Sequence, residues 1–241
     1  MANYVLVHGS WLGGWCWQRV TPLLSAAGHT VLAPSLTGLG DRSHLVGKTK
    51  LGAVIDLNLH IQDVGAWLEW EDLSDVILVG HSYAGMVITA VADRMPDRIA
   101  HLFYVDAVIP EDGKAIVDLI PPEMAASVRA AAAANDDPTR MPPAPPEALG
   151  ITDPGDVAWV TAKSVGMPMA THEQKIELTG AYKNIAKRTY VACTDPVLGG
   201  LEATAAAARD DPDCNYFEIA TGHDPMITKP RELAELLLAG A

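Results

Sequence analysis

The stretch VILVGHSYAG, residues Val76 to Gly85, joins two kinds of sequence at one serine. Its aliphatic first half is typical of a buried strand, and AGMVITAVADRMP, which begins at Ala84, has the apolar spacing of a helix. Ser82 lies at the junction, with the small residues Gly80 and Ala84 two positions away on either side. This arrangement fits the G-x-S-x-G turn that presents a nucleophilic serine, where small residues let the backbone pass close by. On these residues alone, Ser82 fits a helix cap equally well.

Strand-like and helix-like runs alternate along most of the chain. The predicted strands are YVLVH, HTVLAPS, DVILVG, IAHLFYVDA, RTYVACT and NYFEIAT. The predicted helices are WCWQRVTPLLSAAG with a stop at Gly28, residues 56–70, AGMVITAVADRMP, and PRELAELLLAG starting at Pro230. Apolar strands separated by helices predict an α/β fold, in which a mostly parallel sheet of six or more strands is flanked by helices on both faces.

The alternation stops between residues 110 and 186. This segment is rich in alanine and proline, as in RAAAAANDDPTRMPPAPPEALG, and it has helical patches without a clear strand. Apolar residues recur along it, so we predict a packed helical cap at 110–186 over a core formed by 1–109 and 187–241. The alternative is that its proline-rich part, around 131–146, is a loose loop.

The composition describes an acidic globular chain. The 241 residues, 49% apolar and 20% charged, suffice for one hydrophobic core. A formal net charge of -13 repels phosphate backbones, so we expect no nucleic-acid partner. The start MANYVLVHGS lacks leader features, no apolar window reaches membrane length, and the three cysteines form no C-x-x-C pair. We therefore predict a cytoplasmic protein with no membrane partner, and the sequence leaves the oligomeric state open, a homodimer included.

A serine nucleophile needs a base, and histidine is the usual one. In hydrolases with this turn the order along the chain is serine, acid, histidine, so the candidates are His101, His172 and His223. His101 lies inside a predicted strand and His172 in the predicted cap. His223 follows the last predicted strand, at the same sheet edge as Ser82, and is the predicted base.

Two aspartates compete for the role of acid. Asp106 ends the strand HLFYV, and Asp195 follows the strand RTYVACT, so both lie at the carboxyl edge of the sheet. Asp195 precedes a proline, which is also a common turn pair. Asp106 lies in an apolar stretch, where burying a carboxylate without a partner is costly, and this slightly favours Asp106. The residues leave the choice open.

The stretches VLVHGSWLGGWCW, SLTGLGDRSHL, GHSYAGMVI, YVDAVIPEDG and GHDPMITKPRELA span most of the chain outside the predicted cap. They resemble the α/β-hydrolase superfamily, in particular bacterial esterases related to plant methylesterases, hydroxynitrile lyases and pyrethroid hydrolases. The resemblance implies a Ser-His-Asp triad with Ser82 and His223, and an oxyanion hole formed by the backbone N–H groups of Ser10 and Tyr83. Family members place the acid after the penultimate strand, which favours Asp195, whereas some bacterial relatives keep one that matches Asp106.

Two departures from this family bear on the type of reaction. The hydroxynitrile lyases have threonine where this chain has Gly9, and lysine where it has Asp224. That lysine helps cyanide to leave, and an aspartate would repel cyanide. The resemblance therefore implies ester hydrolysis more than lyase chemistry.

The predicted function is that of a serine hydrolase, which cleaves carboxylic esters of small to medium hydrophobic substrates through an acyl-enzyme. We expect no metal and no organic cofactor, because VGKTK lacks the earlier glycine of a phosphate-binding loop and no cluster has metal-ligand spacing. Gly9, Trp11 and Trp159 are predicted to line the substrate pocket. The alternatives are another triad enzyme, such as a hydroxynitrile lyase, a C–C hydrolase or a perhydrolase, and a small-molecule receptor on the same fold.

Overall fold

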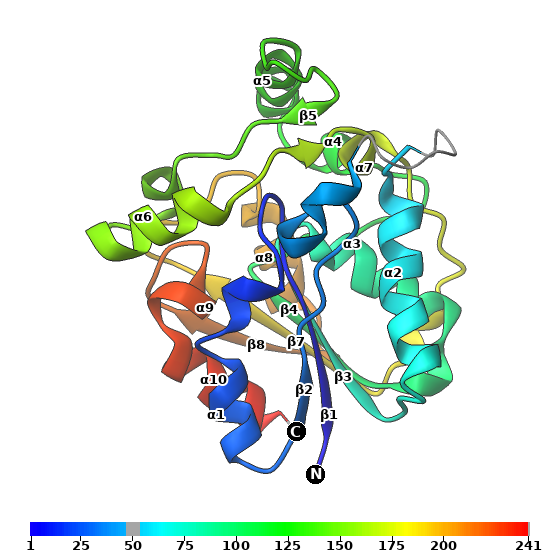
Figure 1. Ribbon diagram of the computed structural model, residues 1–241. Coiled ribbons are helices and arrows are strands. Elements are labelled where there is room, and N and C mark those ends of the chain that lie inside the picture. The colour runs from blue at the N-terminus through cyan, green and yellow to red at the C-terminus, as the bar shows by residue number, and fades with distance from the viewer. Residues whose placement is uncertain (47–53, 241) are drawn as a thin grey trace.

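The computed structural model of the protein describes residues 1–46 and 54–240, so the sequence Gly47-Lys48-Thr49 lies outside the described residues. Its main sheet has six parallel strands in the order β2-β1-β3-β4-β7-β8 (Figure 1). These strands are β1 (Asn3–Val7), β2 (Thr30–Leu32), β3 (Val76–His81), β4 (Ile99–Val105), β7 (Lys187–Cys193) and β8 (Cys214–Ile219). Because all six run in the same direction, the segments that follow β1, β3, β4, β7 and β8 meet at one edge of the sheet.

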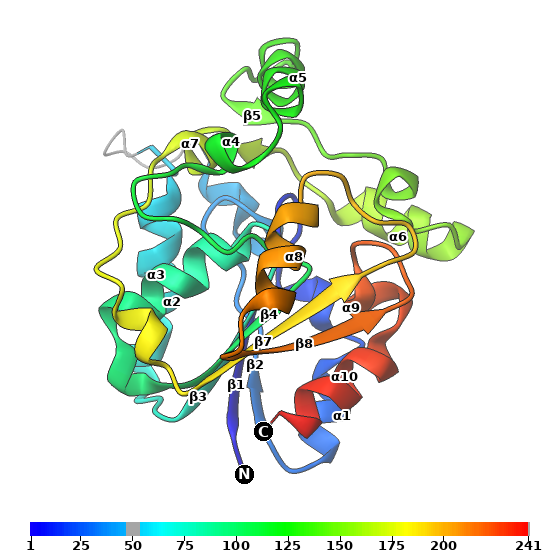
Figure 2. The ribbon, with the colours of Figure 1, turned by 180° about the vertical axis from the view of Figure 1, so that it is seen from behind.

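Helices cover both faces of the sheet (Figures 1 and 2). One face packs against α2 (Leu57–Trp70), α3 (Ala84–Arg94) and α8 (Glu202–Asp210). The other packs against α1 (Thr21–Ala26), α9 (Pro225–Thr228) and α10 (Pro230–Ala239). The predicted three-layer α/β architecture is therefore the observed one.

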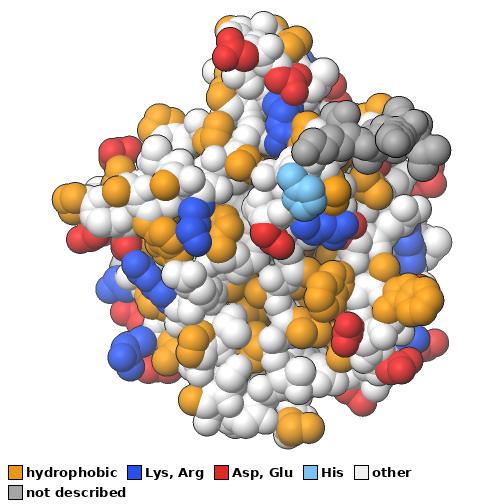
Figure 3. Space-filling view, in the orientation of Figure 1, with side chains coloured by type: hydrophobic (Ala, Val, Ile, Leu, Met, Phe, Trp, Pro, Cys, Tyr) orange, Lys and Arg blue, Asp and Glu red, His pale blue; other side chains and the backbone are white. Residues whose placement is uncertain are grey.

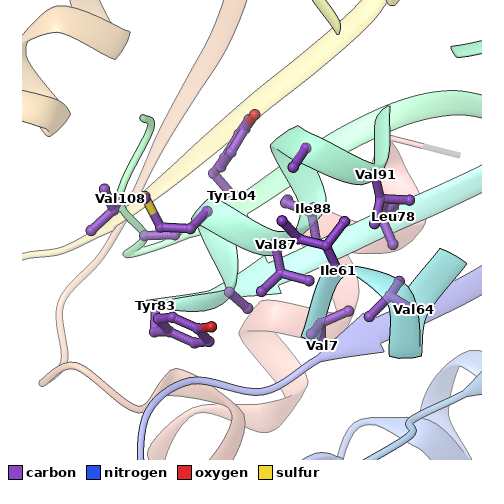
Figure 4. Close-up of a cluster of buried hydrophobic side chains, with 14 of the residues drawn as sticks. Val7, Ile61, Val64, Leu78, Tyr83, Val87, Ile88, Val91, Tyr104 and Val108 are labelled. Atoms are coloured by element: carbon purple, nitrogen blue, oxygen red, sulfur yellow. The ribbon is translucent and has the colours of Figure 1, made fainter. Parts of the chain in front are cut away.

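The main sheet has one core cluster on each face, because successive side chains of a strand point to opposite faces. In β3, Leu78 belongs to the cluster under α2 and α3, whereas Ile77 and Val79 belong to the one under α1 and α10. Figure 4 shows part of the first cluster, in which Ile61 and Val64 of α2 lie near Val87, Ile88 and Val91 of α3, together with Val7 and Leu78 of the sheet. Helix α3 is buried along almost its whole length, which fixes the turn that precedes it.

The chain between β4 and β7 crosses the carboxyl edge of the sheet (Figure 1). Its elements are α4 (Ile116–Leu119), α5 (Pro122–Ala133), β5 (Arg140–Met141), η4 (Pro146–Leu149), α6 (Pro154–Lys163), β6 (Met167–Pro168), α7 (Ala170–Glu173) and η5 (Ala181–Asn184). The sequence predicted its helical character but no strand, and the antiparallel pair β5–β6 corrects this. Strands of two residues are too short to give an alternating signal.

The carboxylate of Asp93 fastens the end of this segment to α3. It accepts hydrogen bonds from the backbone N–H groups of Thr179, at 2.6 Å, and Gly180, at 2.9 Å. The N–H of Tyr182 donates to the same carboxylate. The return of the chain to the sheet is therefore held by a buried charge that has several donors.

The prediction of one helix ending at Gly28 is wrong. The region contains a short 3-10 helix, η1 (Gly14–Trp17), and a separate helix α1 that starts at Thr21. Pro22 lies in the first turn of α1, where its missing N–H costs nothing, whereas within a longer helix it would break a hydrogen bond. Gly28 does end α1, in a left-handed conformation with φ 89°.

No helix in the described residues is both long enough and apolar enough to cross a membrane. On the face seen in Figure 3, acidic and basic side chains are interspersed with apolar ones.

Candidate active site

Ser82 occupies a strained turn directly after β3. Its φ is 55°, in the left-handed region, and its carbonyl oxygen accepts hydrogen bonds from the N–H groups of Gly85, at 3.1 Å, and Val108, at 3.2 Å. A methyl group added at Gly80 would lie 2.8 Å from Ile88, and one added at Gly85 would clash with the carbonyl of Val108. At the start of α3, the backbone that passes closest to the neighbouring loop is therefore that of Gly85. This explains why alanine fits at position 84, where the motif has its second glycine.

Backbone strain concentrates at this edge of the sheet. Five non-glycine residues of the described chain have positive φ, and three of them follow strand ends here: Trp11 at 64°, Ser82 at 55° and Asp106 at 42°. Such conformations persist where the surrounding structure enforces them, and they cluster at functional sites. Ser82 N–H donates to the carbonyl of Val105, so the turns after β3 and β4 are tied to each other.

His223 and Asp106 form a buried hydrogen-bonded pair. Nδ1 of His223 lies 2.7 Å from Oδ2 of Asp106, and the other carboxylate oxygen accepts from the N–H of Cys193 at 3.1 Å. Both side chains are at least 95% buried. Burial alone would lower the pKa of His223, but the hydrogen bond and charge of Asp106, together with the charge of Asp224, raise that pKa above its ordinary value of 6.5. The imidazole is thus oriented and made more basic.

Among the described residues, no hydrogen bond or ion pair joins the carboxylate of Asp195 to His223. Asp195 is exposed in the loop after β7, and its backbone N–H donates to the carbonyl of Thr221. Asp106 reaches the imidazole although β7 lies between β4 and β8, because its turn, with φ 42° and its N–H bonded to the carbonyl of Val191, directs the carboxylate toward His223. The geometry therefore favours the acid after β4, against the position that the family resemblance suggested.

The other two histidines considered as bases are occupied elsewhere. His101 in β4 contacts the hydroxyl of Thr189 and the carbonyl of Gly240, each at 2.9 Å. His172 in α7 lies 3.2 Å from the hydroxyl of Ser10. In the described part of the chain, the hydroxyl of Ser82 forms no hydrogen bond with His223. In free enzymes the distance between nucleophile and base is often long, and it shortens when substrate binds.

The loop after β1 passes directly beside Ser82. A methyl group added at Gly9 would lie 2.8 Å from Cβ of Ser82 and 2.7 Å from Nδ1 of His81. These distances are shorter than real Cβ contacts, so only glycine fits here without a shift of its neighbours. A threonine at this position, as in the lyases, would require a different arrangement.

His8, which the sequence analysis did not single out, orients the next peptide group. The N–H of Leu36 donates to Nε2 of His8, so the proton is on Nδ1, which donates to the carbonyl of Gly9 at 2.8 Å. The Gly9–Ser10 peptide is trans, so its N–H points away from His8.

In the described part of the chain, the N–H groups of Ser10 and Tyr83, the residues of the predicted oxyanion hole, meet no protein acceptor. Two buried residues with free N–H donors are typical of an oxyanion hole.

Asp224 places a second buried carboxyl beside the imidazole. It is 1% exposed, and neither of its oxygens has a hydrogen-bond partner among the described residues. Burial raises its pKa from 3.8 to about 6, the charge of His223 opposes this, and that of Asp106 adds to it. Its Oδ1 lies 3.7 Å from Nε2 of His81, whose own pKa is held well below 6.5 by burial and by the neighbouring His223.

The two tryptophans predicted to line the pocket lie in different places. Trp11 follows Ser10, and its carbonyl accepts from the N–H of Val165 at 3.0 Å. Trp159 of α6 packs edge to face on Trp15, with ring centroids 5.0 Å apart, and lies under the guanidinium of Arg19. These contacts of Trp159 attach α6 to the region around η1. Within the described ranges, no group of three or more His, Cys, Asp or Glu side chains could hold a metal ion.

Residues 4–236 match the family described as "Alpha/beta hydrolase family", and the chain belongs to this family. A carbendazim hydrolyzing esterase from Nocardioides sp. (strain SG-4G) is 39% identical over 247 residues, which cover 99% of each chain. Methylesterase 8 of Arabidopsis thaliana is 35% identical over 109 residues, 45% of this chain and 39% of that protein. The structure of an extracellular alpha/beta-hydrolase from a Paenibacillus species superposes with a TM-score of 0.86 at 24% identity, covering 100% of this chain and 99% of the other. The predicted fold is thus confirmed, as is the prediction of a hydrolytic enzyme, because matching relatives are named as esterases and hydrolases.

Proposed function

We propose that the protein hydrolyses carboxylic esters, with Ser82 as nucleophile, His223 as general base and Asp106 as the orienting acid. The observation that carries this proposal is the 2.7 Å hydrogen bond between His223 and Asp106, at the same sheet edge as the strained turn of Ser82. It supports Asp106 in preference to Asp195 as the acid. Relatives named as esterases support the choice of ester bonds.

In the acylation half-reaction, the Ser82 oxygen attacks the ester carbonyl carbon while Nε2 of His223 takes the hydroxyl proton. The charge that develops on the carbonyl oxygen is stabilised by the N–H groups of Ser10 and Tyr83. When the intermediate collapses, the bond to the alkoxy group breaks, and His223 returns the proton to the departing alcohol. Asp106 keeps Nδ1 protonated and stabilises the imidazolium.

In the deacylation half-reaction, water replaces the alcohol. His223 removes one proton from the water, the hydroxide oxygen attacks the acyl carbon, and the bond to Ser82 breaks. The proton passes from His223 back to the Ser82 oxygen. The products are one carboxylic acid and one alcohol, and the protein is unchanged.

We propose small to medium hydrophobic esters as substrates. A net charge of -13 disfavours polyanionic compounds. The matching relatives include proteins named for hydrolysis of carbendazim and, from Sphingobium wenxiniae, a pyrethroid hydrolase that is 36% identical over 115 residues, 47% of this chain and 38% of that protein. Apolar side chains such as Met167 and Met169 are buried within the segment between β4 and β7.

Other reactions on the same residues are less well supported. The close approach of Gly9 to Ser82 and the carboxyl of Asp224 next to His223 both differ from the lyase pattern. A receptor with an idle triad would not need the strain at Ser82 and Asp106.

The test compares wild type with Ser82→Ala on p-nitrophenyl acetate, butyrate and longer acyl esters. We expect wild type to release p-nitrophenol with saturation kinetics, with turnover abolished in the variant. Asn135→Ala, in the segment between β4 and β7, is a control that should stay active. Wild type without turnover on any ester, but with tight binding of an ester, would instead indicate a receptor.

A further inference from the structure

We infer that His172 is a positioning residue, which holds both residues of the proposed oxyanion hole from the segment between β4 and β7. This inference rests on the proposed function of Ser82, and it adds a residue that lies outside the triad. The starting observation is that one buried side chain of α7 contacts Ser10 and Tyr83, which belong to two different loops of the sheet edge.

The hydrogen bonds fix which nitrogen of His172 carries the proton. The Thr171 hydroxyl donates to the carbonyl of Pro168 at 2.6 Å, and a carbonyl can only accept. The same hydroxyl oxygen lies 2.9 Å from Nδ1 of His172, so Nδ1 must be the donor of that second bond. Burial lowers the pKa of His172 to about 4, with a further small decrease from His60, so the ring is neutral at pH 7. Nε2 is then an acceptor.

That acceptor faces the hydroxyl of Ser10 at 3.2 Å. Ser10 therefore donates its proton to His172, and its side chain is fixed by the α7 ring. The carbonyl of Gly9, on the other side of the same peptide group, is held by His8. The N–H of Ser10 is thus set by one histidine of the core and one histidine of the segment between β4 and β7.

The ring of His172 also lies flat on the ring of Tyr83. The centroids are 5.2 Å apart and the planes differ by 10°. The Tyr83 hydroxyl is anchored in turn: it donates to Nδ1 of His60 at 2.9 Å, because Nε2 of His60 must donate to the carbonyl of Thr37. Tyr83 is therefore held at its ring face by His172 and at its hydroxyl by His60.

Oxyanion stabilisation depends on donors placed before the charge develops, and an error of about 1 Å in placement can cost roughly 100-fold in rate. A residue that fixes both donors should therefore affect kcat much more than KM. A residue that only stabilised the fold would change the melting temperature without this selective effect.

Three variants and a control separate these possibilities. His172→Phe keeps a ring on Tyr83 but removes the acceptor, Ser10→Ala removes the matching donor, and His172→Gln restores an acceptor without the ring. His29→Phe makes the same change near the opposite edge of the sheet, where His29 accepts from the N–H of Ala2 and packs edge to face on Tyr4.

For His172→Phe we expect kcat for p-nitrophenyl esters to fall about 10- to 100-fold with KM within about threefold, while His29→Phe stays near wild type. The double variant Ser10→Ala/His172→Phe should be no slower than the worse single variant, because both remove one interaction. His172→Gln should recover part of kcat. Wild-type kcat in His172→Phe, or multiplicative losses in the double variant, would overturn the inference.

A second measurement uses the wild-type protein and needs neither enzymatic activity nor a correctly folded variant. In ¹⁵N spectra of wild type labelled at histidine, the His172 ring should give the shifts of a neutral Nδ1–H tautomer at pH 7. A neutral Nε2–H tautomer, or an imidazolium, would contradict the inference while leaving the proposed ester hydrolysis intact. Ester turnover by wild type, lost in Ser82→Ala, tests the proposed function separately.

Discussion

Oδ2 of Asp106 lies 2.7 Å from Nδ1 of His223, although 117 positions separate the two residues in sequence. The contact forms because β4 and β8 end at the same edge of the sheet and because the turn at Asp106 takes a left-handed conformation. It leaves Nε2 as the nitrogen of His223 that is available to a hydroxyl. The predictions below follow from this pair and from the groups around it.

The two aspartates considered as acid should respond differently to the same substitution. Asp106→Asn should lower kcat by roughly 1,000- to 10,000-fold, because an amide cannot keep His223 in the right tautomer or stabilise its charge. Asp195→Asn, at the exposed loop after β7, is the matched control and should stay within about threefold of wild type. Steady-state kinetics on p-nitrophenyl butyrate provides the measurement. A large decrease of kcat in Asp195→Asn, with none in Asp106→Asn, would show that Asp195 is the acid.

The pH dependence of kcat/KM should report the basicity of His223. Only the neutral imidazole can accept the Ser82 proton, and the pKa of His223 lies above 6.5, so activity should fall on the acid side with a midpoint above pH 6.5. The charge of Asp224 contributes to that raised pKa, so Asp224→Asn should move the midpoint to lower pH. A midpoint unchanged in this variant would show that Asp224 is not ionised where His223 titrates.

Asp224 should also make the stability of the protein depend on pH. Its carboxyl has a pKa of about 6 in the folded protein against an ordinary value of 3.8, so the folded state binds more protons between these values. The free energy of unfolding should therefore decrease as pH rises from about 4 to 6. Asp224→Asn removes this dependence and should be the more stable protein at pH 8, by up to about 3 kcal/mol.

Urea unfolding at pH 4 and at pH 8 measures this difference. Asp210→Asn, at the exposed end of α8, is the control and should change little at either pH. Equal effects of Asp224→Asn at both pH values would contradict the burial of an ionisable carboxyl at this position.

The approach of Gly9 to Ser82 predicts a sharp effect of one methyl group. Gly9→Ala should lower kcat by about 100-fold, because the new Cβ must displace Ser82, His81 or the loop itself. Gly65→Ala in α2 is the matched control: its Cβ would have an ordinary contact with Met95 at 3.6 Å, and the protein should gain up to about 1 kcal/mol of stability. Kinetics and thermal unfolding of both variants check this, and full activity in Gly9→Ala would contradict it.

Much of the fold could be predicted from the sequence, because uniformly apolar runs such as VILVG indicate buried parallel strands. The turn at Ser82 could be predicted only from the preceding strand, the following helix and the later His223 together, since the small residues beside the serine fit a helix cap equally well. The break between η1 and α1 was missed, because the apolar pattern continues across it and only Pro22 marks the new helix start.

The acid could not be chosen from the sequence, for a physical reason. Asp106 and Asp195 both follow strands at the same edge, and the choice depends on how each turn directs its carboxylate, since the strand before Asp195 is the one that pairs with β8. His8 and His172 were not identified as parts of the site for a similar reason. Their roles come from hydrogen bonds to backbone and side chains distant in sequence, and the sole local signal was that His8 directly precedes Gly9.

With Asp106 as the acid, as we propose, the loop after β7 has no part in proton transfer. That loop is exposed from Thr194 to Val197 and lies on the outside of the molecule. A short affinity tag or fluorescent reporter inserted after Pro196 would therefore be carried at the rim of the enzyme and could be used for immobilisation or detection. In relatives whose acid follows the penultimate strand, the same insertion would interrupt the chemistry, so this point of attachment is particular to an architecture in which β4 provides the carboxylate.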